Sequence, residues 1–89
     1  MFIRIDNVPS DITEEEIMAL FNNSPRVKNV AIKSIAGNKS VIIWVRLNVE
    51  SRAVINGIAD YINGRYVRGT PIKACAPLFF NEPVFNDSD

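Results

Sequence analysis

The sequence contains no histidine, a single cysteine and no long apolar run, and each absence excludes a class of function. Without histidine there is no Ser-His-Asp or Cys-His nucleophile system and no imidazole ligand for a metal. Cys75 alone forms neither an internal disulfide nor a multi-cysteine zinc site. No apolar stretch approaches the roughly 18 residues that a membrane-spanning helix needs. We therefore expect a protein that is not an enzyme, with no cofactor, no metal and no membrane association.

The chain of 89 residues also has no net charge, because its 10 Lys and Arg residues balance its 10 Asp and Glu residues. A domain that binds nucleic acid by charge alone usually has a pI above about 9, whereas this sequence has a pI of about 6.2. The start of the chain lacks the basic segment and cleavage site of a signal peptide. A lone unpaired cysteine is typical of a reducing compartment. We expect an intracellular protein, in the cytoplasm or the nucleus.

What the sequence does contain is enough apolar residues, 47%, for one small folded domain. Six periodic segments follow one another, separated by short turn signals. Thr13 and Glu16 have the spacing of a capping box before the first helical stripe. Gly57 interrupts the second helical stripe, at a cost of about 1 kcal/mol relative to alanine. The expected strands are residues 2–8, 27–35, 40–47 and 70–76, and the expected helices are residues 13–21 and 50–62.

This order, β-α-β-β-α-β, predicts an α+β, ferredoxin-like plait. Two helices pack on one face of a four-stranded antiparallel sheet, and the other face is left for a partner. Glu14, Glu15 and Glu16 are interpreted as a favourable helix start. Cys75 is interpreted as a packing or inert residue.

Four stretches, in the right order, resemble the RNA-recognition motif (RRM) family over about residues 1–77. Residues 3–9 resemble the hexapeptide of the family's first strand, and residues 12–21 resemble its first helix. Residues 40–47 occupy the place of the third-strand octapeptide. Asn63-Gly64, then Gly69, then Ile72 and Ala74 match the family's final segment. The resemblance implies a domain that binds single-stranded RNA on its free sheet face.

The departures from the family pattern concern the three aromatic positions that stack bases. By position, the resemblance places Arg4, Ile42 and Trp44 there, and only Trp44 is aromatic. Ser40 stands where the octapeptide begins with a basic residue, although Lys39 is adjacent. Each base stacked on an aromatic ring contributes about 1–3 kcal/mol to binding, so the two missing aromatic residues lower the binding free energy by roughly 2–6 kcal/mol. Arg4 recovers part of this, since a guanidinium plane also stacks on bases and pairs with phosphate.

The predicted site is therefore a basic sheet face around one tryptophan, a composition typical of platforms for single-stranded nucleic acid. The alternatives are that Trp44 belongs to the core and that the charged residues are ordinary solvated strand residues. The sequence does not separate RNA from single-stranded DNA. The candidate nucleic-acid-binding residues are Arg4, Trp44, Ile42, Arg46, Lys33, Lys73, Phe2 and Lys39.

Residues 78–89 are interpreted as an aromatic, acidic tail that follows a domain of residues 1–77. The tail contains Phe79, Phe80 and Phe85 and three acids, so the first 77 residues hold all 10 basic residues and 7 of the 10 acids, a net +3. Three interpretations stay open for it: a disordered end, an aromatic segment that folds back over the free sheet face, and a docking peptide.

A second hypothesis is a protein-interaction module that binds another protein or a second copy of the chain. The U2AF-homology-motif subgroup of the family captures a partner's tryptophan with an Arg-x-Phe motif before the last strand. The corresponding residues here are Arg65, Tyr66 and Val67, so the phenylalanine is missing. The tail aromatics Phe79, Phe80 and Phe85 belong to the same hypothesis. A third hypothesis, a small ferredoxin-like hydrolase, lacks a glycine-rich phosphate loop.

Overall fold

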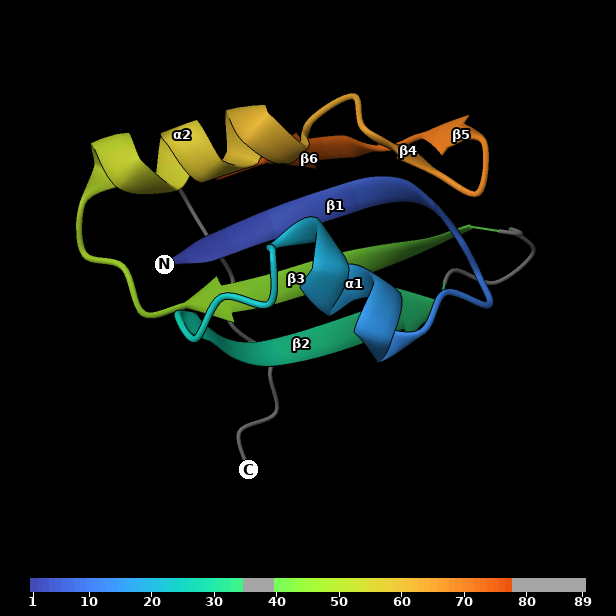
Figure 1. Cartoon of the computed structure of the whole chain (residues 1–89), viewed down its shortest axis with the longest axis horizontal. Helices are drawn as coiled ribbons and strands as arrows, with labels where there is room; N and C mark the ends of the chain where they lie inside the picture. The colour runs from blue at the N-terminus through green and yellow to red at the C-terminus, as the bar shows by residue number, and fades with distance from the viewer. Residues whose placement is uncertain (35–39, 78–89) are drawn as a thin grey trace.

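The structure is a computed structural model that describes residues 1–34 and 40–77. Within these two ranges, eight elements follow one another (Figure 1). They are β1 (Phe2–Pro9), α1 (Glu14–Leu20), β2 (Val27–Ser34), β3 (Ser40–Leu47), α2 (Arg52–Ile62), β4 (Tyr66–Val67), β5 (Thr70–Pro71) and β6 (Lys73–Cys75).

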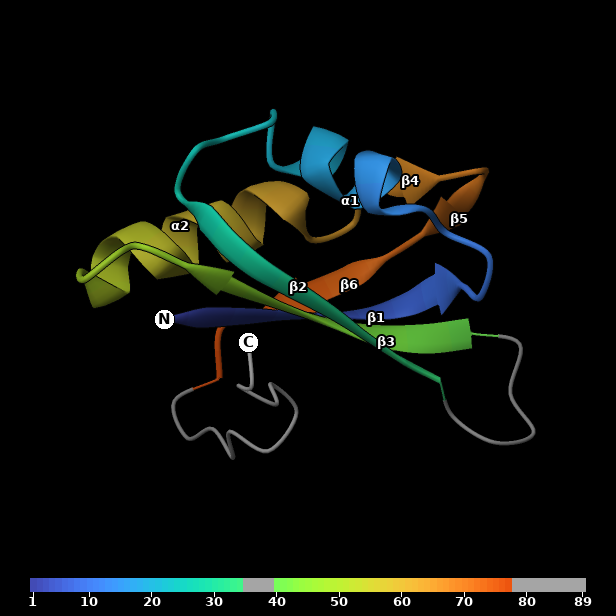
Figure 2. The same ribbon diagram turned by 90° about the horizontal axis from the view of Figure 1, so that it is seen from below.

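Four of the strands form one antiparallel sheet in the order β2-β3-β1-β6. Both helices and the β4-β5 hairpin lie on the same side of this sheet (Figure 2). The ferredoxin-like α+β plait predicted from the sequence is thus confirmed. None of the helices in the described part of the chain has the length and apolarity that a membrane span requires.

Strict alternation along the two central strands builds the core. Ile3 and Ile5 of β1 pair with Val45 and Ile43 of β3, and all four side chains are fully buried. Their neighbours in sequence point to the opposite face, as the two-residue period of a strand requires. No polar side chain is buried among the described residues, so the core is held by apolar packing alone.

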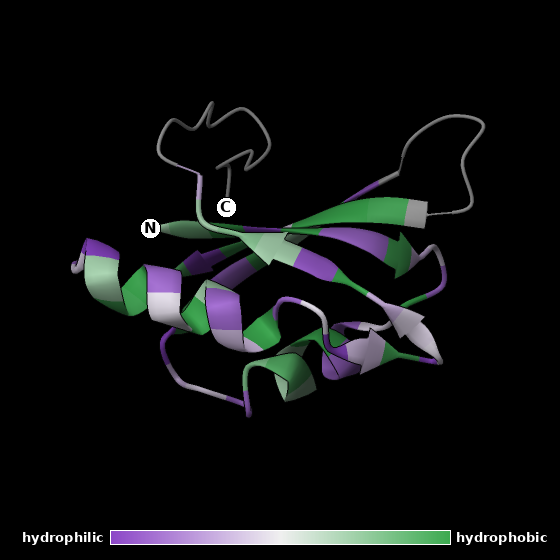
Figure 3. Cartoon of the chain, turned by 90° about the horizontal axis from the view of Figure 1, so that it is seen from above, coloured by the Kyte–Doolittle hydropathy of each residue, from purple (hydrophilic) through white to green (hydrophobic). Residues whose placement is uncertain are grey.

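Both helices begin at the caps that their sequences provide. The Thr13 side chain accepts a hydrogen bond from the Glu16 backbone N–H at 3.2 Å, and the Glu16 carboxylate accepts one from the Thr13 backbone N–H at 2.9 Å. This is the predicted capping box. Ser51 caps α2 by accepting from the Val54 backbone N–H. Along α2, apolar and polar bands alternate as one buried and one outward face require (Figure 3).

The predicted last strand, residues 70–76, is wrong as a single element. Thr70–Pro71 pairs with Tyr66–Val67 in a separate hairpin, and only Lys73–Cys75 joins the main sheet. Arg68 and Gly69 connect the hairpin with φ angles of 52° and 82°. Two consecutive positive φ angles are the mark of a type I′ turn, which matches the twist of paired strands. The hairpin was missed because each of its strands is only two residues long.

The edge strand β6 is covered by the Asn63-Gly64 motif. The Asn63 side-chain oxygen accepts a hydrogen bond from the Ala74 backbone N–H at 3.0 Å, and the Gly64 backbone N–H donates to the Ile72 carbonyl at 2.9 Å. Gly64 has a φ of 86°, which an L side chain rarely adopts. The motif therefore satisfies backbone groups that an exposed edge leaves open.

Two glycines, Gly57 inside α2 and Gly69 in the turn between β4 and β5, predict opposite effects of alanine. At Gly57 in α2, an added Cβ meets no atom within 4 Å, so Gly57→Ala is expected to raise the free energy of unfolding by up to about 1 kcal/mol. At Gly69 the space is equally open but φ is 82°, so Gly69→Ala is expected to lower it by about 1–2 kcal/mol. Urea denaturation of the two variants beside the natural chain checks the pair. Equal effects of the two substitutions would contradict the explanation.

Candidate nucleic-acid interface

The centre of the helix-free sheet face is a row of four residues across the four strands. Trp44 of β3 lies between Ala31 of β2 and Arg4 of β1, and Arg4 lies next to Cys75 of β6. Side chains directly opposite one another on neighbouring strands have Cβ atoms about 5 Å apart. Trp44 is flanked in its own strand by the buried residues Ile43 and Val45. Its outward position, predicted from the alternation, is therefore confirmed.

Arg4 makes two contacts on this face. Its guanidinium carbon lies 5.8 Å from the centre of the Trp44 ring, within the range of a cation–π interaction. Its Nε also donates to the Asp6 carboxylate at 2.9 Å, with both side chains partly exposed. The family resemblance places Arg4 at a base-stacking position, and the structure adds that its guanidinium lies over the Trp44 ring and is paired with Asp6.

A second aromatic–arginine pair lies one step along the same face. Phe2 of β1 pairs in register with Arg46 of β3, which in turn pairs with Asn29 of β2. The Arg46 guanidinium carbon lies 5.3 Å from the centre of the Phe2 ring. The face thus carries two rings, each with an arginine over it.

The remaining described candidates surround these two pairs. Lys33 of β2 is exposed beside Ile42 of β3, and Lys73 of β6 is exposed opposite Asp6. Seven of the eight candidate nucleic-acid-binding residues therefore share one face, and Lys39 lies outside the described residues. Among the described residues of this face, four cations and Asp6 sum to a net charge of +3. No group of three metal-binding side chains occurs in residues 1–34 and 40–77.

The candidate partner-binding residues lie elsewhere. Phe79, Phe80 and Phe85 fall outside the described residues. Arg65 lies over the ring of Tyr61 of α2, 5.0 Å from its centre, on the helix side of the molecule. Tyr66 is 70% exposed, whereas Val67 is buried. The position that holds phenylalanine in the tryptophan-capturing subgroup therefore belongs to the core here.

Comparison with known proteins identifies the architecture. No model of a known protein family and no curated protein matches the chain. Among solved structures, the third RRM of Pes4 matches with a TM-score of 0.70 and 21% identity, over 91% of this chain and 95% of that one. The chain has the RRM fold. The third RRM of Mip6 matches with a TM-score of 0.66 and 22% identity, over 82% and 87% of the two chains.

A third match is the RRM of Rna15 in a structure with bound RNA (GU). It has a TM-score of 0.65 and 16% identity, over 88% of this chain and 83% of that one. The fold predicted from the four RRM-like stretches is therefore confirmed, while the identities are too low to transfer individual residues.

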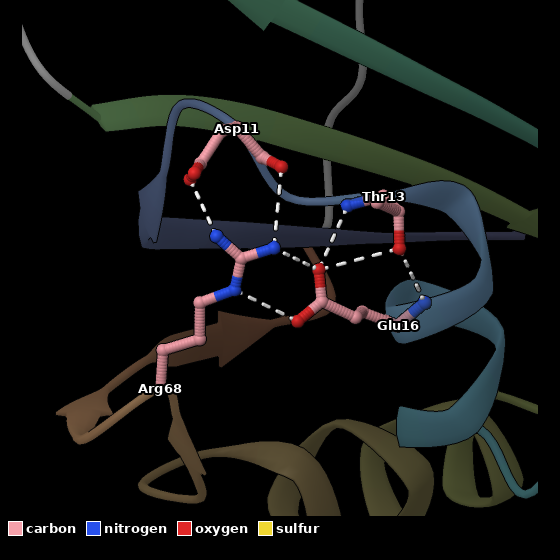
Figure 4. Close-up of polar contacts among 4 residues, drawn as sticks. All are labelled: Asp11, Thr13, Glu16 and Arg68. Atoms are coloured by element: carbon pink, nitrogen blue, oxygen red, sulfur yellow. Dashed lines mark hydrogen bonds and ion pairs between the residues drawn. The ribbon is translucent and has the colours of Figure 1, made fainter.

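A polar cluster on the helix side connects the β4-β5 hairpin to α1 (Figure 4). Arg68 donates to both carboxylate oxygens of Glu16, from Nε at 2.9 Å and from Nη2 at 2.6 Å. Its Nη1 lies 2.7 Å from an Asp11 carboxylate oxygen. From the sequence, Glu16 is interpreted only as part of a favourable helix start, because no local pattern indicates a partner so far along the chain.

These contacts shift the pKa values of Glu16 and Arg68 in opposite directions. The hydrogen bonds from Arg68 and from the Thr13 backbone lower the pKa of Glu16 from 4.5 to about 2. The same Glu16 bonds, with those to Asp11, raise the pKa of Arg68 above its ordinary value. The pair is bidentate, the favoured geometry between guanidinium and carboxylate.

The depressed pKa of Glu16 predicts an acid-sensitive fold. The stabilisation is fully present above pH 4.5, where the unfolded chain is also ionised, and is lost as the pH falls from 4.5 through about 2. Arg68→Gln is expected to flatten this part of the profile. Urea midpoints measured between pH 6 and pH 2 check the prediction, with Arg26→Gln as a matched control that keeps the cluster. An unchanged slope in Arg68→Gln would show that another acid controls the transition.

Proposed function

We propose that this protein is a non-enzymatic RNA-binding module that contacts a few single-stranded nucleotides on its helix-free sheet face. The observation that carries the proposal is the central row, in which Trp44 and Arg4 lie side by side in the middle of the sheet. A base that stacks on Trp44 lies within reach of the guanidinium of Arg4. The RRM of Rna15 with bound RNA supports the proposal at the level of the fold.

The surrounding charges suit a phosphate backbone. Lys33, Lys73 and Arg46 lie around the Trp44–Arg4 pair on the same face, so a strand that crosses the sheet meets cations on both sides. Asp6 offsets part of the charge of Arg4. With one tryptophan in place of three stacking aromatics, we expect weak binding by the isolated domain.

We further propose that residues 1–77 are the binding unit and that residues 78–89 compete with RNA for the sheet face. Two carbonyls at the end of the described chain are fixed by Arg52 of α2, which donates to Ala76 and Pro77, each at 3.0 Å. Three phenylalanines and three acids follow, a composition that complements a basic face that contains aromatic rings.

Trp44→Ala is expected to weaken RNA binding between about fivefold and a hundredfold, the loss of one stacked base. The probe is a pool of random eight-nucleotide RNAs, titrated into the full chain and followed by amide chemical shifts. Tyr61→Ala, an exposed aromatic on the helix side, is the matched control and is expected to bind like the natural chain. The shifts are expected on β1 and β3.

No sheet-face shift at millimolar RNA would overturn the RNA proposal and favour a protein-binding role for this face. Equal losses in Trp44→Ala and Tyr61→Ala would show that stacking on Trp44 contributes nothing. The same titration with Phe79, Phe80 and Phe85 replaced by serine tests the tail, since removing a competitor tightens binding. A parallel series with single-stranded DNA of matched length separates the two nucleic acids.

Arg4 is expected to contact phosphate as well as stack. Arg4→Gln then lowers the slope of log affinity against log salt by about 0.7, the value for one phosphate contact on a single strand. Arg68→Gln removes the same charge from the helix side and is expected to leave the slope unchanged. Affinities measured by fluorescence anisotropy at four salt concentrations check both variants. An equal slope in natural chain and Arg4→Gln would restrict Arg4 to stacking.

A further inference from the structure

The helix side of the molecule contains an open apolar groove between the end of α1 and the outer side of α2. Its volume is about 420 Å³, within the range of binding pockets. Residues from three elements and from the turn after α1 line it, among them Phe21, Leu47, Val54, Gly57, Ile58 and Tyr61. None of these residues belongs to the candidate RNA interface.

Helix α2 has a second apolar stripe that faces this groove. The buried stripe, Ile55, Ala59 and Ile62, packs in the core. A separate set at positions 54, 57, 58 and 61 has the i, i+3, i+4, i+7 spacing of one helical face. At the ends of this set, Val54 is 40% exposed and Tyr61 is 58% exposed. Ile58 of this set packs partly against the core. Val54 and Tyr61 are exposed, so the outer part of the stripe is available to a partner.

Gly57 lies at the middle of the second stripe. An added Cβ meets no atom within 4 Å, so nothing inside the chain requires the absence of a side chain here. Glycine inside a helix is destabilising, and close approach of another group is one of the reasons for its presence. The open space above Gly57 is continuous with the groove that it lines.

Two arginines lie at or beside the groove. Arg26 lines it beside Leu47. Arg65 lies over the ring of Tyr61 and its Nη1 is 3.5 Å from the carbonyl of Leu20, two residues that line the groove. Among the described residues, no carboxylate lines the groove. An apolar groove with one cation in its lining and a second beside it is complementary to an apolar segment that carries acids.

We propose that this groove docks an acidic peptide segment of a partner protein. Two or three of its apolar or aromatic side chains contact Val54, Tyr61 and the space over Gly57, and its carboxylates pair with Arg26 and Arg65. An RNA strand fits less well, because most of the lining offers neither donors nor cations to phosphate. The proposal is independent of RNA binding, since the two surfaces share no residue.

Display selection of random 16-residue peptides against the full chain tests the proposal. The enriched sequences are expected to combine acidic residues with aromatic or aliphatic ones. As synthetic peptides, they are expected to lose at least tenfold in affinity against Gly57→Leu, which fills the groove, and against Arg26→Glu, which reverses one of its charges. Both substitutions lie at exposed positions, and amide spectra verify that each variant is folded.

Ala53→Leu is the matched control, because it adds the same side chain to an exposed α2 position that does not line the groove. It is expected to leave peptide affinity unchanged, and so is Trp44→Ala, which separates this proposal from the RNA interface. No enrichment over the bare support, or enriched peptides that bind Gly57→Leu as well as the natural chain, would overturn the proposal. Groove shifts with the RNA pool would replace the peptide by RNA. A concentration-dependent dimer abolished by Gly57→Leu would replace it by a second copy.

Discussion

The two-residue period of β1 and β3 is the constraint on which the rest of the molecule depends. Ile3, Ile5, Ile43 and Val45 point to the helices and are fully buried. The residues between them are thereby turned to the other face, where no helix covers them (Figure 2). No polar side chain is buried in the core among the described residues, and Arg4, Trp44 and Arg46 therefore lie on the helix-free face. The composition of the sheet face follows from the packing of the core.

The register between the strands then decides which outward residues meet. A slip of one residue between β1 and β3 turns an entire strand over and places Trp44 among the helices, so the buried isoleucines specify the register strongly. In the observed register Arg4 faces Trp44 and Phe2 faces Arg46. The pairing changes after Ile5, where β1 contains one extra residue. Asn7 absorbs it with a φ of 64° and donates from its side chain to the Pro71 carbonyl.

Alternation and helical spacing make most of the fold predictable from the sequence. The strand of residues 40–47 and the cap at Thr13 depend on neighbours within a few positions, so local pattern is enough to find them. The β4-β5 hairpin depends on distant residues instead. Arg68 adopts a φ of 52° while it is held by Glu16, 52 positions earlier in the chain. No local sequence pattern predicts a contact between residues so far apart in the chain.

The same distinction applies to the candidate site. Alternation assigns Arg4, Trp44 and Lys33 to one face, but the stacking of Arg4 on Trp44 requires the register. The groove was not predicted from the sequence, because only one helical stripe was identified in residues 50–62, and Val54 and Tyr61 do not belong to it. Their own helical spacing is visible in the sequence. A second apolar stripe on a surface helix is the signal that finds such a groove.

The local charges around Arg4 bear on the RNA interaction proposed above for a chain without net charge. Arg4 is shared between the Trp44 ring and the Asp6 carboxylate, so a phosphate that approaches it must compete with Asp6. The free energy gained when Arg4 contacts a phosphate is partly offset, because the new hydrogen bond replaces the one to Asp6 instead of adding to it. The contacts with Trp44 and Asp6 hold Arg4 in place in the absence of RNA, which lowers the entropy lost in the proposed complex. In the proposed complex, the placement of the charged residues on one face therefore contributes more to RNA binding than the total charge of the chain does.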